Sequence, residues 1–81
     1  MIEVYLYGNL REKVEKKMGE VSSIMTFEYV EGERFQDCLS RLGIELTDIG
    51  NCYINRNLAK PDDVLHDLDS LELNPIEKNP I

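Results

Sequence analysis

The sequence is poor in the residues from which active sites and metal centres are usually built. It has 81 residues with one histidine, two cysteines and no tryptophan. His66 has no serine or cysteine nucleophile at a recognisable spacing, so no constellation for acid–base catalysis is visible. Cys38 and Cys52 have no metal-ligand neighbours at a suitable spacing and are too few for a disulfide framework. We therefore expect no enzymatic activity, metal or cofactor, and we expect both thiols to be reduced and buried.

Positive charge and long apolar runs are also scarce. Nine basic against sixteen acidic residues give a formal net charge of −7, which repels a phosphate backbone and anionic lipid headgroups. No stretch approaches the roughly 20 apolar residues of a membrane span, and residues 1–4 enter a strand pattern without a basic leader. We expect a cytoplasmic protein without nucleic-acid or membrane partners. The acidic surface is compatible with docking on a basic protein surface, although solubility alone accounts for it more simply.

Several carboxylates gather around the single histidine. Asp62, Asp63, Asp67 and Asp69 flank His66, and such a group of oxygens could attract a hard cation. Their spacing does not match the calcium-binding loop, which needs a glycine and a closing glutamate at fixed positions. We interpret the segment as a solvated acidic turn.

The apolar pattern predicts one helix among several strands. Alternation and β-branched residues predict strands at 2–7, 23–30, 52–54 and 70–74, with a short extended segment at 58–60. The clearest helix is predicted for residues 33–42, ended by Gly43 in the left-handed conformation. Its apolar stripe consists of Phe35, Cys38, Leu39 and Leu42. Residues 10–18 are expected to form a short helical turn or a structured loop.

This order of elements predicts an α+β fold in a single domain. A mixed sheet of four to five strands would carry one main helix across one face. The other face would then stay open to solvent or to a partner. The same order is that of the ubiquitin-like β-grasp arrangement.

Local residues narrow this arrangement to a family. Residues 7–12 (YGNLRE) resemble an aromatic-Gly-x-Leu-Arg-Glu stretch, and residues 31–44 resemble the turn, helix and "LGI" exit that follow it. Residues 53–56 (YINR) and 65–71 (LHDLDSL) are similar to a strand end and a turn of the same family, and Pro75 falls at its proline after the last strand. In these stretches the chain resembles the MoaD/ThiS family, the small sulfur carriers of molybdopterin and thiamine synthesis. The resemblance implies a β-grasp domain over 1–76 and a short tail at 77–81.

The chain departs from this family at two turns and at its tail. Arg56 and Leu68 stand where the family usually has glycine, and a leucine in such a turn would be strained by about 1 kcal/mol or more. We therefore expect both turns to differ in shape. The family's carriers finish in Gly-Gly, whose carboxylate is adenylated and converted to a thiocarboxylate. The sequence instead finishes in Pro80-Ile81, whose fixed φ and β-branched side chain fit a narrow channel badly.

These observations favour a non-enzymatic MoaD/ThiS-like protein that acts by protein–protein interaction, linked to sulfur-transfer or cofactor-biosynthesis machinery. The alternatives are a genuine sulfur carrier with an atypical C-terminus, and a small subunit or regulatory module of a larger metalloenzyme or synthase complex. The resemblance implies a protein partner: an activating-type enzyme, a synthase large subunit or an oxidoreductase. We predict as binding residues the open-face tyrosines and three tail residues, namely Tyr5, Tyr7, Tyr53, Pro75, Ile76 and Ile81. The tyrosines would serve equally well as the cover of a half-exposed sheet.

Overall fold

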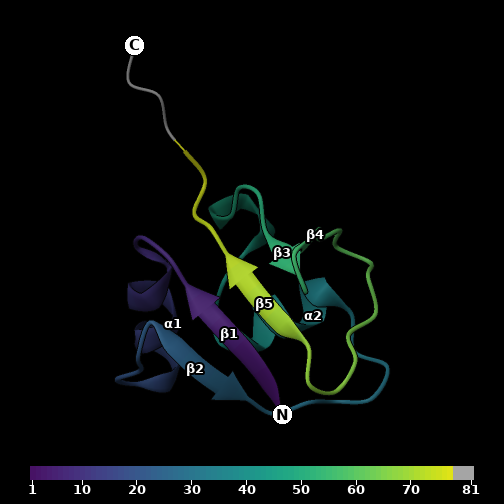
Figure 1. Cartoon of the computed structure of the whole chain (residues 1–81). Helices are drawn as coiled ribbons and strands as arrows, with labels where there is room; N and C mark the ends of the chain where they lie inside the picture. The colour runs from purple at the N-terminus through teal and green to yellow at the C-terminus, as the bar shows by residue number, and fades with distance from the viewer. Residues whose placement is uncertain (78–81) are drawn as a thin grey trace.

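The computed structural model describes residues 1–77, and this range contains five strands and two helices. The elements are, in chain order, β1 (Ile2–Leu6), α1 (Leu10–Met18), β2 (Ile24–Phe27), α2 (Phe35–Leu42), the short 3₁₀ turn η1 (Leu46–Asp48), β3 (Tyr53–Ile54), β4 (Asn57–Leu58) and β5 (Ser70–Leu73). The strands form one mixed sheet in the order β2-β1-β5-β3-β4, with α2 lying behind it in Figure 1. β1 and β5 are parallel and the other pairs antiparallel. The predicted α+β architecture is confirmed.

The hydrophobic core lies between one face of this sheet and both helices. In β1 the side chains of Ile2, Val4 and Leu6 are buried, while Glu3 and Tyr5 point to the other face, as the period of two requires. The segment at 10–18 is a regular helix rather than a loop. The helices contribute six buried side chains to the core, namely Leu10, Val14, Phe35, Cys38, Leu39 and Leu42. Each fully buried leucine stabilises the fold by about 1.5–3 kcal/mol.

An ion pair in α2 joins the helix to the segment between β2 and α2. Arg41 donates from Nε to Glu33 at 2.6 Å and from Nη2 to the other carboxylate oxygen at 2.7 Å. The same Nη2 donates to the Glu28 carbonyl at 2.8 Å, and the guanidinium lies 4.3 Å from the Phe27 ring centroid. The helix begins two residues later than predicted, because Arg34 is extended, pairs with Val64 and donates its N–H to the Asp37 carboxylate at 3.2 Å. The strand ends at Phe27. Gly43 ends the helix with φ 89°, in the left-handed conformation predicted for it.

The expectation that the turns at Arg56 and Leu68 differ in shape is wrong. Both residues adopt the left-handed conformation that favours glycine, with φ 70° and 71°. Asn55 and Arg56 form a two-residue hairpin loop between the paired residues Ile54 and Asn57, and such loops need positive φ at both central positions. Leu68 is held by a hydrogen bond from its N–H to the Met1 carbonyl at 3.1 Å. Strand pairing and these hydrogen bonds therefore impose the left-handed backbone conformation, and both residues adopt it although it is strained for a residue with a Cβ atom.

The acidic segment before β5 also differs from the prediction. Asp69 is buried rather than solvated. Its carboxylate accepts hydrogen bonds from the Asn55 side chain at 2.8 Å and from the His66 N–H at 2.7 Å. Asp69 thus ties the hairpin turn to the chain that enters β5.

Replacing Arg56 or Leu68 with glycine should stabilise the protein by about 0.5–1 kcal/mol. The left-handed conformation costs a residue with a Cβ atom about 1–2 kcal/mol, and the greater freedom of glycine in the unfolded chain offsets part of the gain. Urea unfolding followed by circular dichroism should show a higher midpoint at an unchanged slope.

Arg56→Ala and Leu68→Ala are matched controls, because alanine keeps the Cβ atom and therefore the strain. A glycine variant that is no more stable than its alanine counterpart would contradict the assignment of strain to that turn.

Candidate functional site

A single row of side chains crosses the sheet on the face away from the helices. The strand register places Tyr5 opposite both Ile24 and Glu72, and Tyr53 opposite both Glu72 and Leu58. We call these five residues the cross-sheet row: Ile24, Tyr5, Glu72, Tyr53 and Leu58. The two aliphatic residues at its ends are 57% and 59% exposed. Each of the five strands therefore supplies one residue to a continuous, largely apolar line with a carboxylate at its centre.

The two acidic residues of this face have different surroundings. Glu3 accepts a hydrogen bond from the Tyr5 hydroxyl, and this bond raises the pKa of Tyr5 above its ordinary value. Tyr5 is therefore neutral at physiological pH. Glu72 is a partly buried residue, and its carboxylate has no ion-pair or hydrogen-bond partner within residues 1–77. It lines a shallow recess together with Tyr5, Asn55, Arg56 and Ser70.

The chain leaves the sheet through a short paired segment, Asn74–Ile76, which we call the tail root. Gly50 donates to the Asn74 carbonyl at 2.9 Å, and the Ile76 N–H donates to the Asp48 carbonyl at 3.0 Å. Pro75 lies between these bonds as a bridge partner of Ile49. The tail root therefore extends β5 beyond Leu73, and its position at the end of the sheet is fixed by backbone hydrogen bonds (Figure 1).

Two glycines make room for the tail root. A Cβ atom at Gly8 would lie 2.7 Å from the Cγ atom of Pro75, and one at Gly50 would lie 3.0 Å from the Pro75 carbonyl oxygen. Contacts this short are strongly repulsive, so the backbone of the turn between β1 and α1 approaches the proline ring because it lacks a side chain.

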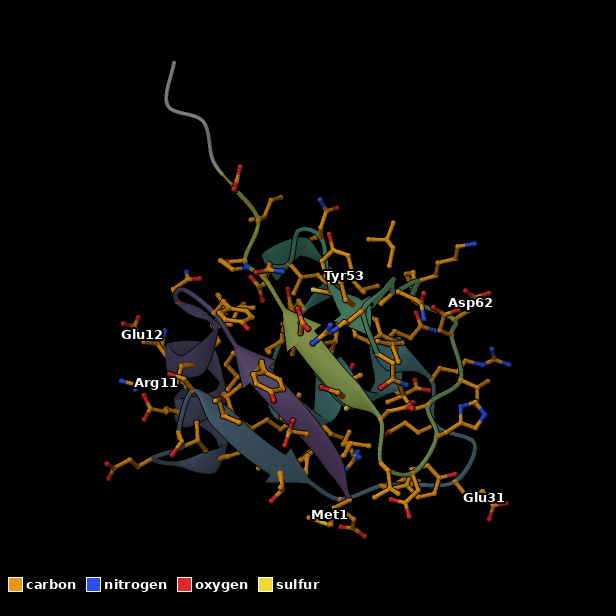
Figure 2. The ribbon with its side chains drawn as sticks, viewed as in Figure 1. Met1, Arg11, Glu12, Glu31, Tyr53 and Asp62 are labelled. Carbon is orange, nitrogen blue, oxygen red and sulfur yellow. The ribbon has the colours of Figure 1, made fainter. Side chains whose placement is uncertain are left out.

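Of the predicted binding residues, two lie in the cross-sheet row and two in the tail root, whereas Tyr7 belongs to neither. Tyr5 and Tyr53 share the cross-sheet row, and Tyr53 also lines a recess with Pro75 at the tail root. Figure 2 shows Tyr53 at the end of the sheet where the chain departs. Tyr7 lies just beyond β1 and is 45% exposed, and Ile76 is 48% exposed. Ile81 lies outside the described residues.

Four residues of this surface escaped the sequence reasoning. Ile24 and Glu72 could have been found from the period-two pattern of their strands, because they occupy the same face as the tyrosines. Leu58 and Arg56 could not, because their positions depend on the pairing of β3 with β4 rather than on a local pattern.

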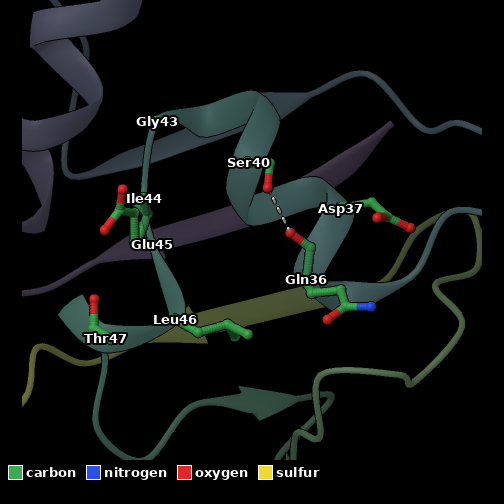
Figure 3. A pocket seen from close by; sticks show the side chains of 8 residues that line it. All are labelled: Gln36, Asp37, Ser40, Gly43, Ile44, Glu45, Leu46 and Thr47. Atoms are coloured by element: carbon green, nitrogen blue, oxygen red, sulfur yellow. Dashed lines mark hydrogen bonds between the residues drawn. The ribbon is translucent and has the colours of Figure 1, made fainter.

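A second hollow lies on the helix side of the molecule. Eight residues line it, namely Gln36, Asp37, Ser40, Gly43, Ile44, Glu45, Leu46 and Thr47 (Figure 3). The Ser40 hydroxyl donates to the Gln36 carbonyl of its own helix at 3.2 Å. This hydroxyl is thus engaged by its own helix, and no hydrogen bond joins it to Asp37 or Glu45, the two carboxylates of the lining.

Both cysteines are free and buried, as predicted. Burial raises the pKa of the Cys38 thiol to about 12, with the nearby Glu33 adding to the effect. Burial likewise raises the pKa of Cys52. Since the thiolate is the reactive form of cysteine, the Cys38 thiol, protonated at neutral pH, belongs to the core rather than to a sulfur-transfer centre.

Metal and membrane features can be examined only for residues 1–77. Within this range no group of three or more histidine, cysteine, aspartate or glutamate side chains is arranged to hold a metal ion. The helices of the same range are too short and too polar to cross a membrane.

The order and pairing of the strands, with the helices on one face, are those of the ubiquitin-like β-grasp fold. The crystal structure of SAMP1 from Haloferax volcanii is similar to this chain, with a TM-score of 0.69 over 98% of both chains. The two sequences are 18% identical, so the likeness shows a common fold alone. No family model and no curated protein sequence matches the chain.

Replacing Gly8 with alanine should destabilise the protein more than the same change at Gly32. Both glycines have positive φ, but a Cβ atom at Gly32 would meet nothing within 4 Å. Gly32→Ala should therefore cost about 1 kcal/mol for its backbone conformation, and Gly8→Ala at least about 1 kcal/mol more for the contact with Pro75. Urea unfolding of both variants measures the difference.

Pro75→Ala removes the proline ring and completes a double-mutant cycle with Gly8→Ala. We expect the extra cost at Gly8 to disappear in the Pro75→Ala background, because the two sites are in contact. Equal costs of Gly8→Ala and Gly32→Ala in the unmodified background would show that the tail root is not held against this turn.

Proposed function

We propose that this chain is a non-enzymatic ubiquitin-like protein that binds another protein through its open sheet face and tail root. The cross-sheet row is the observation that carries the proposal. It joins two exposed aliphatic and two aromatic side chains across all five strands, on the sheet face that neither helix covers. Tyrosines in such a patch bury large areas at small entropic cost, which is why they are enriched at protein interfaces.

The tail root extends this surface at one end. Tyr53 belongs to the row and also lines the recess beside Pro75, so a partner seated on β3 would contact the first residues of the tail. Because backbone hydrogen bonds hold the tail root, the partner would meet it in a defined position and with little entropic penalty.

We propose that the partner belongs to sulfur-transfer or cofactor-biosynthesis machinery, as an activating-type enzyme, a synthase large subunit or an oxidoreductase. The resemblance to the MoaD/ThiS family supports this pathway. We further propose the cytoplasm as its compartment, which agrees with two cysteines that remain free. A non-catalytic role is supported by the buried, protonated thiol of Cys38.

The double variant Tyr5→Ser/Tyr53→Ser should lose its protein partner. Each tyrosine at the centre of an interface contributes about 1–2 kcal/mol, so affinity should fall at least about ten-fold. The tagged protein, expressed in its own cells, is purified and its associated proteins are quantified by mass spectrometry. Leu46→Ser, an exposed change in the hollow on the helix side, is the matched control and should leave the same proteins bound. Unchanged recovery with the double variant would refute the docking surface.

A genuine sulfur carrier is the second candidate, and the resemblance of residues 7–12 and 31–44 to the MoaD/ThiS family supports it. On our proposal, intact protein purified from its own cells has an unmodified C-terminal carboxylate. The protein should likewise form no AMP adduct when mixed with ATP and the activating enzyme of its own organism. A mass gain equal to the exchange of one oxygen for sulfur would establish the carrier role and overturn the non-carrier part of the proposal.

A further inference from the structure

We propose that the partner presents an arginine, flanked by apolar side chains, which lies between Tyr5 and Tyr53 and pairs with Glu72. This inference rests on the proposed function and specifies the chemistry of the partner at the same surface. The centre of the cross-sheet row carries the argument. There Glu72, a partly buried residue, stands between two aromatic residues, and its carboxylate has no partner within residues 1–77.

The strand register sets the distance between the two tyrosines on either side of Glu72. Glu72 is directly opposite Tyr5 on one side and Tyr53 on the other. Since adjacent strands are about 4.8 Å apart, the two tyrosines stand about 10 Å apart with the carboxylate between them. A cation placed over the carboxylate would then lie within the roughly 6 Å at which aromatic rings attract it.

The neighbouring groups favour a cation over other ligands. The Tyr5 hydroxyl is already bonded to Glu3, so it does not satisfy Glu72, and its ring is neutral. Glu3 adds a second negative charge beside the same ring. A buried or half-buried carboxylate without a partner is unfavourable in a closed interface, so a partner that covers Glu72 must neutralise it.

A guanidinium suits this position better than an ammonium. It is planar, pairs with a carboxylate through two parallel hydrogen bonds, and stacks on aromatic rings. The chain contains one such arrangement already, because Arg41 makes two bonds to Glu33 and lies over the Phe27 ring. The exposed ends of the row, Ile24 and Leu58, would meet apolar side chains on either side of the arginine.

Replacing Arg56 provides a second variant, whose expected effect on binding is opposite to that of a change at Glu72. Arg56 lines the recess beside Glu72 from the β3–β4 turn but is not within ion-pairing distance of that carboxylate. Its charge has the same sign as the arginine that we propose, so it opposes binding. Arg56→Gly should therefore strengthen the interaction, whereas Glu72→Gln should weaken it.

The test is a titration of the isotope-labelled full chain with the peptide acetyl-Leu-Arg-Leu-amide, followed by amide NMR shifts. The matched control peptide contains citrulline, which has the shape of arginine without its charge. Shifts should map to β1, β5 and β3, and the arginine peptide should bind roughly five-fold more tightly than the citrulline peptide. Added salt should reduce this preference.

Protein variants complete the design. Glu72→Gln should abolish the preference for arginine, and Glu12→Gln, an exposed change on α1, should leave it intact. Equal affinity for the two peptides, absence of binding, or shifts confined to the hollow on the helix side would each overturn the inference. None of these results decides the proposed function, because the docking surface itself has a separate test. That test is which partner proteins the Tyr5→Ser/Tyr53→Ser variant retains.

Discussion

The parallel pairing of β1 with β5 joins residues 3–6 to residues 70–73 at the centre of the sheet. On its inner face this pair buries Val4 and Leu6 against Leu71 and Leu73. The sequence separation is large, so the entropy of closing the chain is offset only when both helices cover this apolar surface. On the outer face the same pairing sets Tyr5 beside Glu72. The same strand pair therefore contributes its inner face to the core and its outer face to the candidate docking surface.

The other constraints act through this pair. β5 positions β3, and the two-residue hairpin turn then positions β4, so the cross-sheet row is complete only when every strand is in register. The tail root continues β5 and is held by hydrogen bonds to residues 48–50. This geometry requires a strained, left-handed backbone conformation at Arg56 and Leu68. Left-handed leucine is costly, but a change of turn would move the strands that follow it.

Periodicity predicted most elements because local patterns reflect burial. The helix at 35–42 and the strands at 2–6 and 70–73 follow from apolar spacing alone. The start of the helix did not, because Arg34 is held in an extended conformation by its pairing with Val64, a contact between distant segments. The turns at Arg56 and Leu68 differ from the prediction because strand pairing and backbone hydrogen bonds outweigh the local preference of these residues. The buried role of Asp69 depends likewise on Asn55, fourteen residues earlier in the chain.

The sequence by itself determined the class of fold, the burial of both cysteines and the presence of tyrosines on an open face, because each depends on a short-range pattern. Only the tertiary structure decided that Tyr5 and Tyr53 flank Glu72, that Ile24 and Leu58 end the same row, and that Pro75 packs against Gly8. The physical reason is register. Which residues face one another across strands is set by the pairing of distant segments, and a shift of one residue would turn each of these side chains to the opposite face.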